Sequence, residues 1–276
     1  MNAPEVSPVL EKLFAAIENN EIALPAMPDL AIKIQGMLDD INVSTQHIVA
    51  AVSTDPVLAS QIIKIANSAL YAGKPKVENL MAAISRIGYK MLRNIIVTFT
   101  MNKISSSTHP VVKKHISEFW IHSRDVAAIS YVIAKSQKHL NQEQAMMAGL
   151  IHDIGTLPLC LYAEKMVSNL DESVLNSLSK KFRATIGNKL LTDWEFPSEL
   201  TEVILAHENL QGDSGSSFSS YADIVTVANM LNPSTTKIIN WDDIPAVKKL
   251  YFSKETCQSF FEIFSEELRT AREMFN

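Results

Sequence analysis

Apolar residues recur every three or four positions along most of this chain, which is the spacing of one face of an α-helix. One such stripe consists of Leu30, Ile34, Met37 and Leu38, and a similar one runs through residues 58–65. No segment alternates apolar and polar residues convincingly in the manner of a half-buried strand, and there is no hairpin turn signature. The pattern therefore predicts an all-α protein, built as a multi-helix bundle.

Local end signals divide these stripes into separate helices. Ser44 is placed to cap one helix, and Asp55-Pro56 combines a capping carboxylate with the proline that favours a first helical turn. Gly88 is expected to end a helix, and residues 91–101 resume the helical pattern after it.

Two loop-like segments set the expected domain organisation. Residues 105–110, with the sequence Ser-Ser-Ser-Thr-His-Pro, separate an N-terminal set of helices from a C-terminal set. Residues 211–220 are rich in glycine and serine and form a second loop. We therefore expect two tightly packed helical subdomains, residues 1–110 and residues 111–276, the second of which ends in accessory amphipathic helices.

Composition narrows the class of protein further. With 276 residues, 47% of them hydrophobic, the chain is long enough for a large core. A net charge of −5 gives no general attraction to nucleic acid or anionic lipid, so neither is expected as a partner. Two separated cysteines, no signal peptide and no apolar run of the ~18 residues that a membrane helix needs indicate a cytoplasmic protein.

Ionisable residues of the second half fall on apolar helix faces. They are His122, His152, Asp153, His207 and Asp223. An almost wholly apolar run precedes His152 and Asp153, so the side chains of these two residues have left water and need a partner. Imidazole and carboxylate are both natural ligands of a divalent metal ion. Because helix bundles build metal sites from facing helices, the pattern indicates such a site on four consecutive helices.

Each of these residues alone also has a structural interpretation. A single inward histidine is more often a hydrogen-bonded core residue than a ligand. Asp223 lies near a helix start and could simply cap the helix that follows the serine-rich loop. The metal interpretation depends on all five residues together, because every one of these inward-facing residues is of a type that binds metal ions.

The order of these residues resembles the H…HD…D pattern of the HD superfamily of metal-dependent phosphohydrolases, whose members are all-helical. The resemblance implies that His122, His152, Asp153 and Asp223 bind a divalent metal such as Fe, Mn, Mg, Ni or Zn. It also implies that His207 stands where the phosphodiesterase branch has a further histidine, which would bind a second ion or phosphate.

Further motifs make the chain similar to the HDOD domain, from about residue 24 to residue 229. They are Leu24-Pro-Ala-Met-Pro28, Ile65-Ala-Asn-Ser-Ala-Leu-Tyr71, Ala83-Ile-Ser-Arg-Ile-Gly88, Phe119-Trp120, Gly149-Leu-Ile-His-Asp-Ile-Gly155 and Trp194-Glu-Phe-Pro197. On physical grounds, Asn67 and Tyr71 within these motifs are expected to hold segments together and to do no chemistry. HDOD proteins are usually regulatory and occur in bacterial signal transduction.

The chain departs from the cyclic-dinucleotide phosphodiesterase branch of the superfamily. Thr156 stands where that branch commonly has lysine, His207-Glu208 stands where it has a doubled histidine, and its GYP signature is absent. A lysine would be a good phosphate partner, so its absence weakens phosphate binding in the expected pocket.

Two functions follow as hypotheses. The first is a regulatory module with an HD-type metal site, which acts by binding a signalling protein or a ligand. The alternative is a metal-dependent phosphohydrolase that acts on a nucleotide or another phosphoester. No catalytic base is identified. Glu208 is a weak candidate and is better explained as a salt-bridged residue, while Arg124 is either a phosphate contact or a surface residue paired with Asp125.

Overall fold

The computed structural model describes residues 8–19, 21–71, 75–167, 170–213, 215–234 and 240–272 of the chain. Within these ranges every regular element is a helix and no strand occurs. The all-α fold expected from the sequence is therefore confirmed.

The N-terminal half contributes five α-helices and one short 3-10 helix within the described part of the chain. Their bounds are α1 Pro8–Glu18, α2 Asp29–Asp39, α3 Thr45–Val52, α4 Pro56–Ala66, η1 Ala69–Tyr71 and α5 Leu80–Ile104.

Local sequence signals explain where these helices begin and bend. The Ser44 side chain accepts a backbone N–H of the first turn of α3. The Asp55 carboxylate accepts the N–H groups of Val57 and Leu58 at 3.0 and 3.2 Å and so begins α4. Gly88 has a φ angle of 76°, which other residues rarely adopt, so the regular helix stops there and resumes within α5. All three expectations are confirmed.

The C-terminal half supplies the helices that surround the residue pair His152-Asp153, which we call the HD motif. They are α6 Pro110–Ala134, α7 Gln142–Ile151, α8 Thr156–Met166, α9 Glu172–Asp193, α10 Ser198–Ala206 and α11 Tyr221–Leu231. The predicted accessory helices follow as η2 Trp241–Asp243, α12 Pro245–Lys249, α13 Lys254–Gln258, α14 Phe260–Ile263 and α15 Ser265–Arg272. Residues 237–239 and 273–276 of the predicted tail lie outside the described residues.

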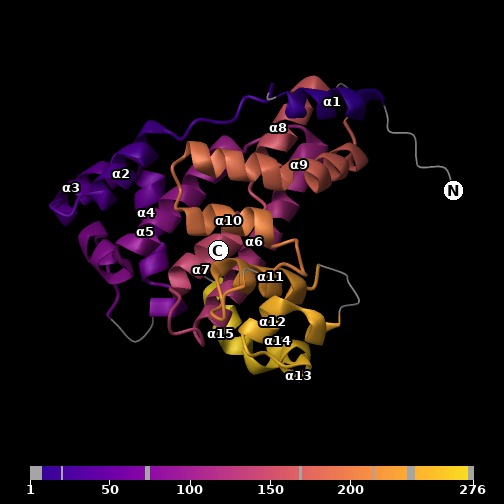
Figure 1. The fold of residues 1–276 in the computed structure, drawn as a ribbon. Coiled ribbons are helices and arrows are strands. Elements are labelled where there is room, and N and C mark those ends of the chain that lie inside the picture. The colour runs from indigo at the N-terminus through magenta and orange to yellow at the C-terminus, as the bar shows by residue number, and fades with distance from the viewer. Residues whose placement is uncertain are drawn as a thin grey trace.

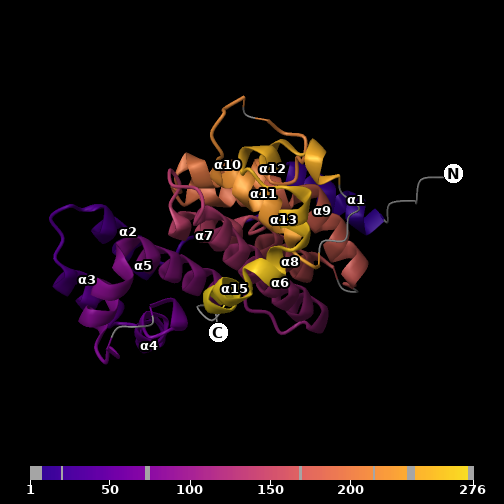
Figure 2. The same cartoon turned by 90° about the horizontal axis from the view of Figure 1, so that it is seen from below.

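Figure 1 shows α2–α5 together at one end of the molecule, with α6–α11 forming the larger body and α12–α15 beneath it. Figure 2 shows the same separation from below. In both views α1 lies against α9, away from α2–α5. The ring centroids of Phe14 and Phe182 are 5.1 Å apart, and Lys181 Nζ is 2.9 Å from Glu18 Oε1. Helix α1, which belongs to the predicted first subdomain, thus packs on a helix of the predicted second one. The boundary at residue 110 stays a prediction.

Two of the sequence motifs join segments that are distant in the chain. Asn67 exchanges two hydrogen bonds with the backbone of Val77, at 2.8 and 2.9 Å. Trp194 Nε1 donates to the carbonyl of Pro25 at 3.0 Å, which ties the segment before α2 to the end of α9. Both contacts satisfy polar groups and fix chain direction. For Asn67 this is the structural role that the sequence predicted.

One apolar stretch, residues 142–166, is long enough by composition alone to cross a membrane, with a mean hydropathy of 1.3 over its most apolar window. We expected no run of this length. In the structure 89% of that window is buried inside the protein, and His152-Asp153 interrupts it, so it forms the centre of the helical body.

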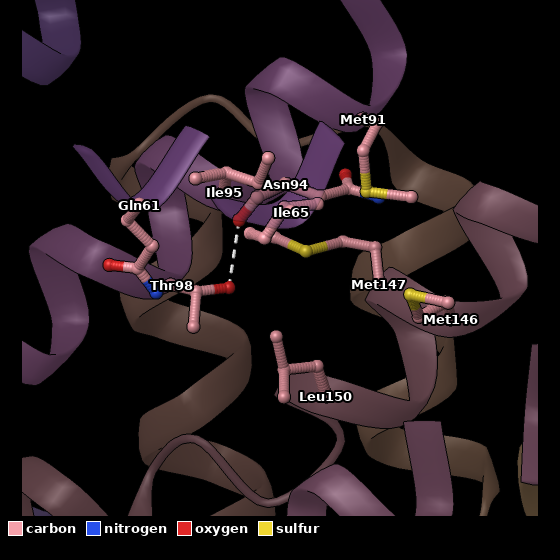
Figure 3. Close-up of a pocket in the computed structure, with 9 residues that line it drawn as sticks. All are labelled: Gln61, Ile65, Met91, Asn94, Ile95, Thr98, Met146, Met147 and Leu150. Atoms are coloured by element: carbon pink, nitrogen blue, oxygen red, sulfur yellow. Dashed lines mark hydrogen bonds between the residues drawn. The ribbon is translucent and has the colours of Figure 1, made fainter. Parts of the chain in front are cut away.

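Figure 3 shows a cavity of about 30 Å³ where α4 and α5 meet α7. Three methionines, Met91, Met146 and Met147, lie around it together with Ile65, Ile95 and Leu150. The polar groups in its lining are amide and hydroxyl groups, and the Thr98 hydroxyl donates to the Asn94 carbonyl at 2.7 Å. Because none of its lining side chains titrates near neutral pH, this cavity belongs to the packing between the two sets of helices.

Candidate metal centre

A close crossing of α6 and α7 brings the two histidines of the HD motif together. A β-carbon added to Gly149 would lie 2.7 Å from Ser130 Oγ and 2.8 Å from Ala127 Cα, so only glycine allows this approach. His152 follows at the end of α7, beside His122 on α6, with their Nε2 atoms 3.1 Å apart.

The carboxylate of Asp153 lies beside these histidines. Its Oδ2 is 3.5 Å from His152 Nε2, and its Oδ1 is 3.3 Å from Nε2 of His207, which follows the end of α10. His152, Asp153 and His207 are all buried, and His122 is partly buried. The structure thus brings together four of the five residues that the sequence singled out. Two further helices, α8 and α9, lie between the two parts of the cluster, so its residues are not on consecutive helices.

The backbone fixes the tautomers of two of these histidines. His152 Nδ1 donates to the Gly149 carbonyl at 2.7 Å, and His207 Nδ1 donates to the Val203 carbonyl at 3.0 Å. Burial lowers the pKa of His152 to about 3, so its ring is neutral. Each Nε2 atom therefore carries a lone pair. His152 Nε2 has His122 Nε2 as its partner, whereas His207 Nε2 faces Asp153 Oδ1, and a carboxylate accepts hydrogen bonds and donates none.

Asp153 is ionised in this setting. Burial favours the neutral acid, but the adjacent guanidinium of Arg183 holds the pKa of Asp153 well below its usual value. Its Oδ1 and His207 Nε2 are both buried and make no hydrogen bond of acceptable geometry. Two acceptors that face one another in this way repel unless a cation lies beside them, and the Arg183 guanidinium, with Nε 2.8 Å from Oδ1, is one such cation.

A divalent ion fits the group His122, His152 and Asp153. Ligand atoms that surround one ion at about 2.1 Å lie about 3.0–3.4 Å apart in octahedral or tetrahedral geometry. In this group the two Nε2 atoms are 3.1 Å apart, and His152 Nε2 is 3.5 Å from Asp153 Oδ2. The outer nitrogens of His152 and His207 already bond to backbone carbonyls, which is the usual way of orienting a histidine ligand.

Asp223 does not join this cluster. Its Oδ2 accepts from both the backbone N–H and the hydroxyl of Ser220, each at 2.8 Å, and the Ser220 side chain caps α11 in return. The α11 residues that line the pocket beside the histidines are Thr226, Asn229 and Met230. The capping interpretation that the sequence left open therefore describes the contacts of Asp223, and we leave it out of the ligand set.

Asp223→Ala is expected to lower the free energy of unfolding by about 1–2 kcal/mol, because it removes the carboxylate that accepts from the backbone N–H and the hydroxyl of Ser220. Metal content should stay at the wild-type level. Urea unfolding followed by circular dichroism, with elemental analysis of the same samples, measures both quantities. Ser220→Ala should give the same pair of results, whereas a folded Asp223→Ala protein without metal would return this carboxylate to the ligand set.

Arg183 is the site residue that the sequence did not indicate. Its Nε lies 2.8 Å from Asp153 Oδ1, and its Nη2 pairs with Glu208 Oε1. The explanation of Glu208 as a salt-bridged residue is therefore confirmed. Other basic residues, such as Lys180 and Lys181, occur on the same helix, so no local signal distinguishes Arg183. Only the packing of α9 against the HD motif does.

Arg124, by contrast, lies elsewhere. Its Nε donates to the Trp120 carbonyl, and the residue lines a separate pocket beside α4 and α5. Asp125 pairs with Arg272 of α15 at 2.8 Å. Arg124 is therefore not a phosphate contact of the cluster of His122, His152, Asp153 and His207, which we call the HD cluster.

A pocket of about 340 Å³ opens onto the cluster. His122, Asp153, Arg183, His207 and Glu208 line one part of it. Leu210, Asn229, Met230 and Ser234 are among the residues of the remainder, and Ser234 Oγ lies 3.1 Å from His122 Nδ1. The pocket is large enough for a small polar ligand to reach the cluster.

Several solved structures share this fold. A candidate metal-dependent phosphohydrolase from Shewanella amazonensis SB2B is 23% identical, with a TM-score of 0.76 and 96% of each chain covered. An HDOD domain protein of unknown function from Geobacter sulfurreducens is 20% identical, with a TM-score of 0.68 over 96% of this chain and 98% of that one. A candidate signal transduction protein from Marinobacter aquaeolei VT8 is 20% identical, with a TM-score of 0.67 over 97% and 66%. At these identities the likeness establishes the fold.

Sequence comparison adds a curated relative and a family. An uncharacterized protein from Treponema pallidum (strain Nichols) is 24% identical over 282 residues, which cover 96% of this chain and 52% of the relative. The chain thus spans about half the length of that protein. The model of the HDOD domain matches residues 24–210, which is more than half of the chain. The chain therefore belongs to the HDOD domain family.

Proposed function

We propose that this protein is a bacterial signalling module that holds one divalent metal ion in its HD cluster and acts by binding a ligand or a partner protein. The observation that supports the metal most directly is the group His122, His152 and Asp153, whose ligand atoms all lie within 4.8 Å of one another. His122, His152 and Asp153 would hold the ion, and His207 would contact the other carboxylate oxygen of Asp153.

The regulatory role is favoured by the state of the carboxylates near the cluster. Asp153 and Glu208 both pair with Arg183, and Asp223 caps a helix. No carboxylate at the cluster is therefore left unpaired to act as a general base. A bound ion would instead serve as a fixed positive charge at the end of the pocket, where an anionic group of a ligand can bind.

A metal-dependent phosphohydrolase is the second candidate, because the pocket of about 340 Å³ gives a phosphoester access to the cluster. A bound metal would polarise a phosphoryl oxygen and lower the pKa of a coordinated water. In this function Arg183 would orient the Asp153 carboxylate, and neutral His122 and His152 would remain ligands. The names of structural neighbours include this activity.

Metal analysis of the purified protein tests the proposal. After incubation with Mn²⁺ and removal of free ions, the wild-type protein should retain about one ion per chain. Asp153→Ala and His152→Ala should each lose it, since each removes a central ligand. His47→Ala is the matched control, because His47 is exposed and bonds only within the first turn of α3. A wild-type protein free of metal at saturating Mn²⁺ and Fe²⁺ would contradict the proposal.

Turnover separates the two candidate functions. The regulatory function predicts no hydrolysis of bis(p-nitrophenyl) phosphate or p-nitrophenyl phosphate by the metal-loaded protein. Hydrolysis that Asp153→Ala abolishes and His47→Ala leaves intact would establish the phosphohydrolase instead. Affinity capture from the native host tests the signalling partner.

We also propose a cytoplasmic location. Both cysteines, Cys160 and Cys257, are buried free thiols, and burial raises the pKa of Cys160 to about 12. Unreactive thiols of this kind fit a reducing compartment.

A further inference from the structure

The HD cluster consists of two overlapping groups of ligand-type atoms that share Asp153. His122, His152 and Asp153 form the first group, and Asp153, His207 and Glu208 form the second. Within each group the ligand atoms lie within 4.8 Å of one another. Judged by residue type alone, the cluster could therefore hold two ions bridged by the Asp153 carboxylate.

A guanidinium group already lies at the second group. Arg183 Nε is 2.8 Å from Asp153 Oδ1, and Arg183 Nη2 pairs with Glu208 Oε1. Arg183 thus contacts both carboxylates that a second ion would need. A guanidinium is planar and carries several N–H donors, so it can pair with two carboxylates at once.

The backbone of α9 holds Arg183 in this place. A β-carbon on Gly155 would collide with the Arg183 carbonyl and would lie 2.5 Å from the backbone nitrogen of Gly187. The residues directly after the HD motif and this turn of α9 are therefore in backbone contact. The Arg183 side chain is three-quarters buried, at 25% exposure. Arg183 is consequently built into the cluster and is not a surface residue that reaches over it.

We infer that Arg183 takes the place of a second metal ion, so that this HD cluster is restricted to one ion. The inference rests on the proposed metal site. A second cation at Asp153, His207 and Glu208 would face the guanidinium at close range and would lose both carboxylates to it. Arg183 therefore acts as a specificity-determining residue, because it sets the number of ions and leaves the ligand that binds in the pocket one metal charge to contact.

The test is the number of Mn²⁺ ions bound by the wild-type protein, Arg183→Gln and Arg183→Lys. Wild type and Arg183→Lys, which keeps the positive charge, should bind one ion. Arg183→Gln should bind two, because it leaves both carboxylates available. Electron paramagnetic resonance gives a second readout, since a single Mn²⁺ produces an isolated six-line spectrum and two neighbouring ions produce a coupled one. The double variant Arg183→Gln with Glu208→Gln should return to one ion.

The outcomes distinguish this inference from the proposal beneath it. A wild-type protein that binds two ions, or an Arg183→Gln protein that still binds one, overturns the inference and leaves the metal site standing. A wild-type protein that binds none overturns both. If Arg183→Gln fails to fold, the spectrum of the wild-type protein decides, because a coupled signal there contradicts the inference and an isolated one supports it.

Discussion

Gly155→Ala is expected to lower the free energy of unfolding by about 3 kcal/mol. The new β-carbon would collide with the Arg183 carbonyl and lie 2.5 Å from Gly187 N, and neither backbone atom can rotate away. Gly155 has helical dihedral angles, with φ at −61°, so space alone excludes alanine here. Urea unfolding followed by circular dichroism measures the loss.

Gly36→Ala is the matched control for this prediction. Gly36 lies within α2, and a β-carbon there would meet nothing within 4 Å. Alanine should stabilise the protein at that position by about 0.5–1 kcal/mol, through its higher helix propensity. Equal effects of the two substitutions would show that α8 and α9 do not make the close contact on which the placement of Arg183 depends.

Acidification is expected to destabilise the metal-free protein by about 2 kcal/mol between pH 7 and pH 5. The pKa of His152 is lowered by burial from 6.5 to about 3 in the folded state. Below pH 6.5 the unfolded chain therefore takes up a proton that the folded protein does not, so the free energy of unfolding decreases as the pH is lowered. Burial lowers the pKa of His122 as well, which acts in the same direction.

His152→Gln tests the origin of this pH dependence. Glutamine cannot titrate, so the dependence of the free energy of unfolding on pH between pH 7 and pH 5 should become weaker. The change should correspond to about one proton fewer taken up on unfolding. The measurement is a series of urea unfolding curves in the presence of EDTA, which removes the contribution of bound metal. An unchanged slope would mean that His152 is already charged in the folded protein, and that its Nε2 is not available as a ligand.

Local signals in the sequence predicted the helices well. Ser44, Asp55 and Gly88 act within one turn of their own position, so their effect is readable from neighbouring residues alone. The inward direction of His152 and His207 followed from helical periodicity in the same way. Asp223 also faces inward, but its partner is Ser220, three residues earlier, a capping spacing that was visible in the sequence.

Contacts between distant helices were less predictable. Periodicity tells which face of a helix is buried, but it does not tell which other helix covers that face. Arg183 meets Asp153 only because two glycines let α9 approach the end of the HD motif. The position of α1 on α9 depends likewise on a contact between Phe14 and Phe182 that no local pattern indicates.

The docking of α1 on α9 also constrains how the chain folds during synthesis. Phe182 follows Phe14 by 168 residues, which ribosomes add over roughly ten to thirty seconds. Throughout that interval the apolar side of α1 has no native partner and is open to chaperones or to misassembly. Closing so long a loop is entropically costly, so we expect α1 to dock only after the local contacts around α9 have formed.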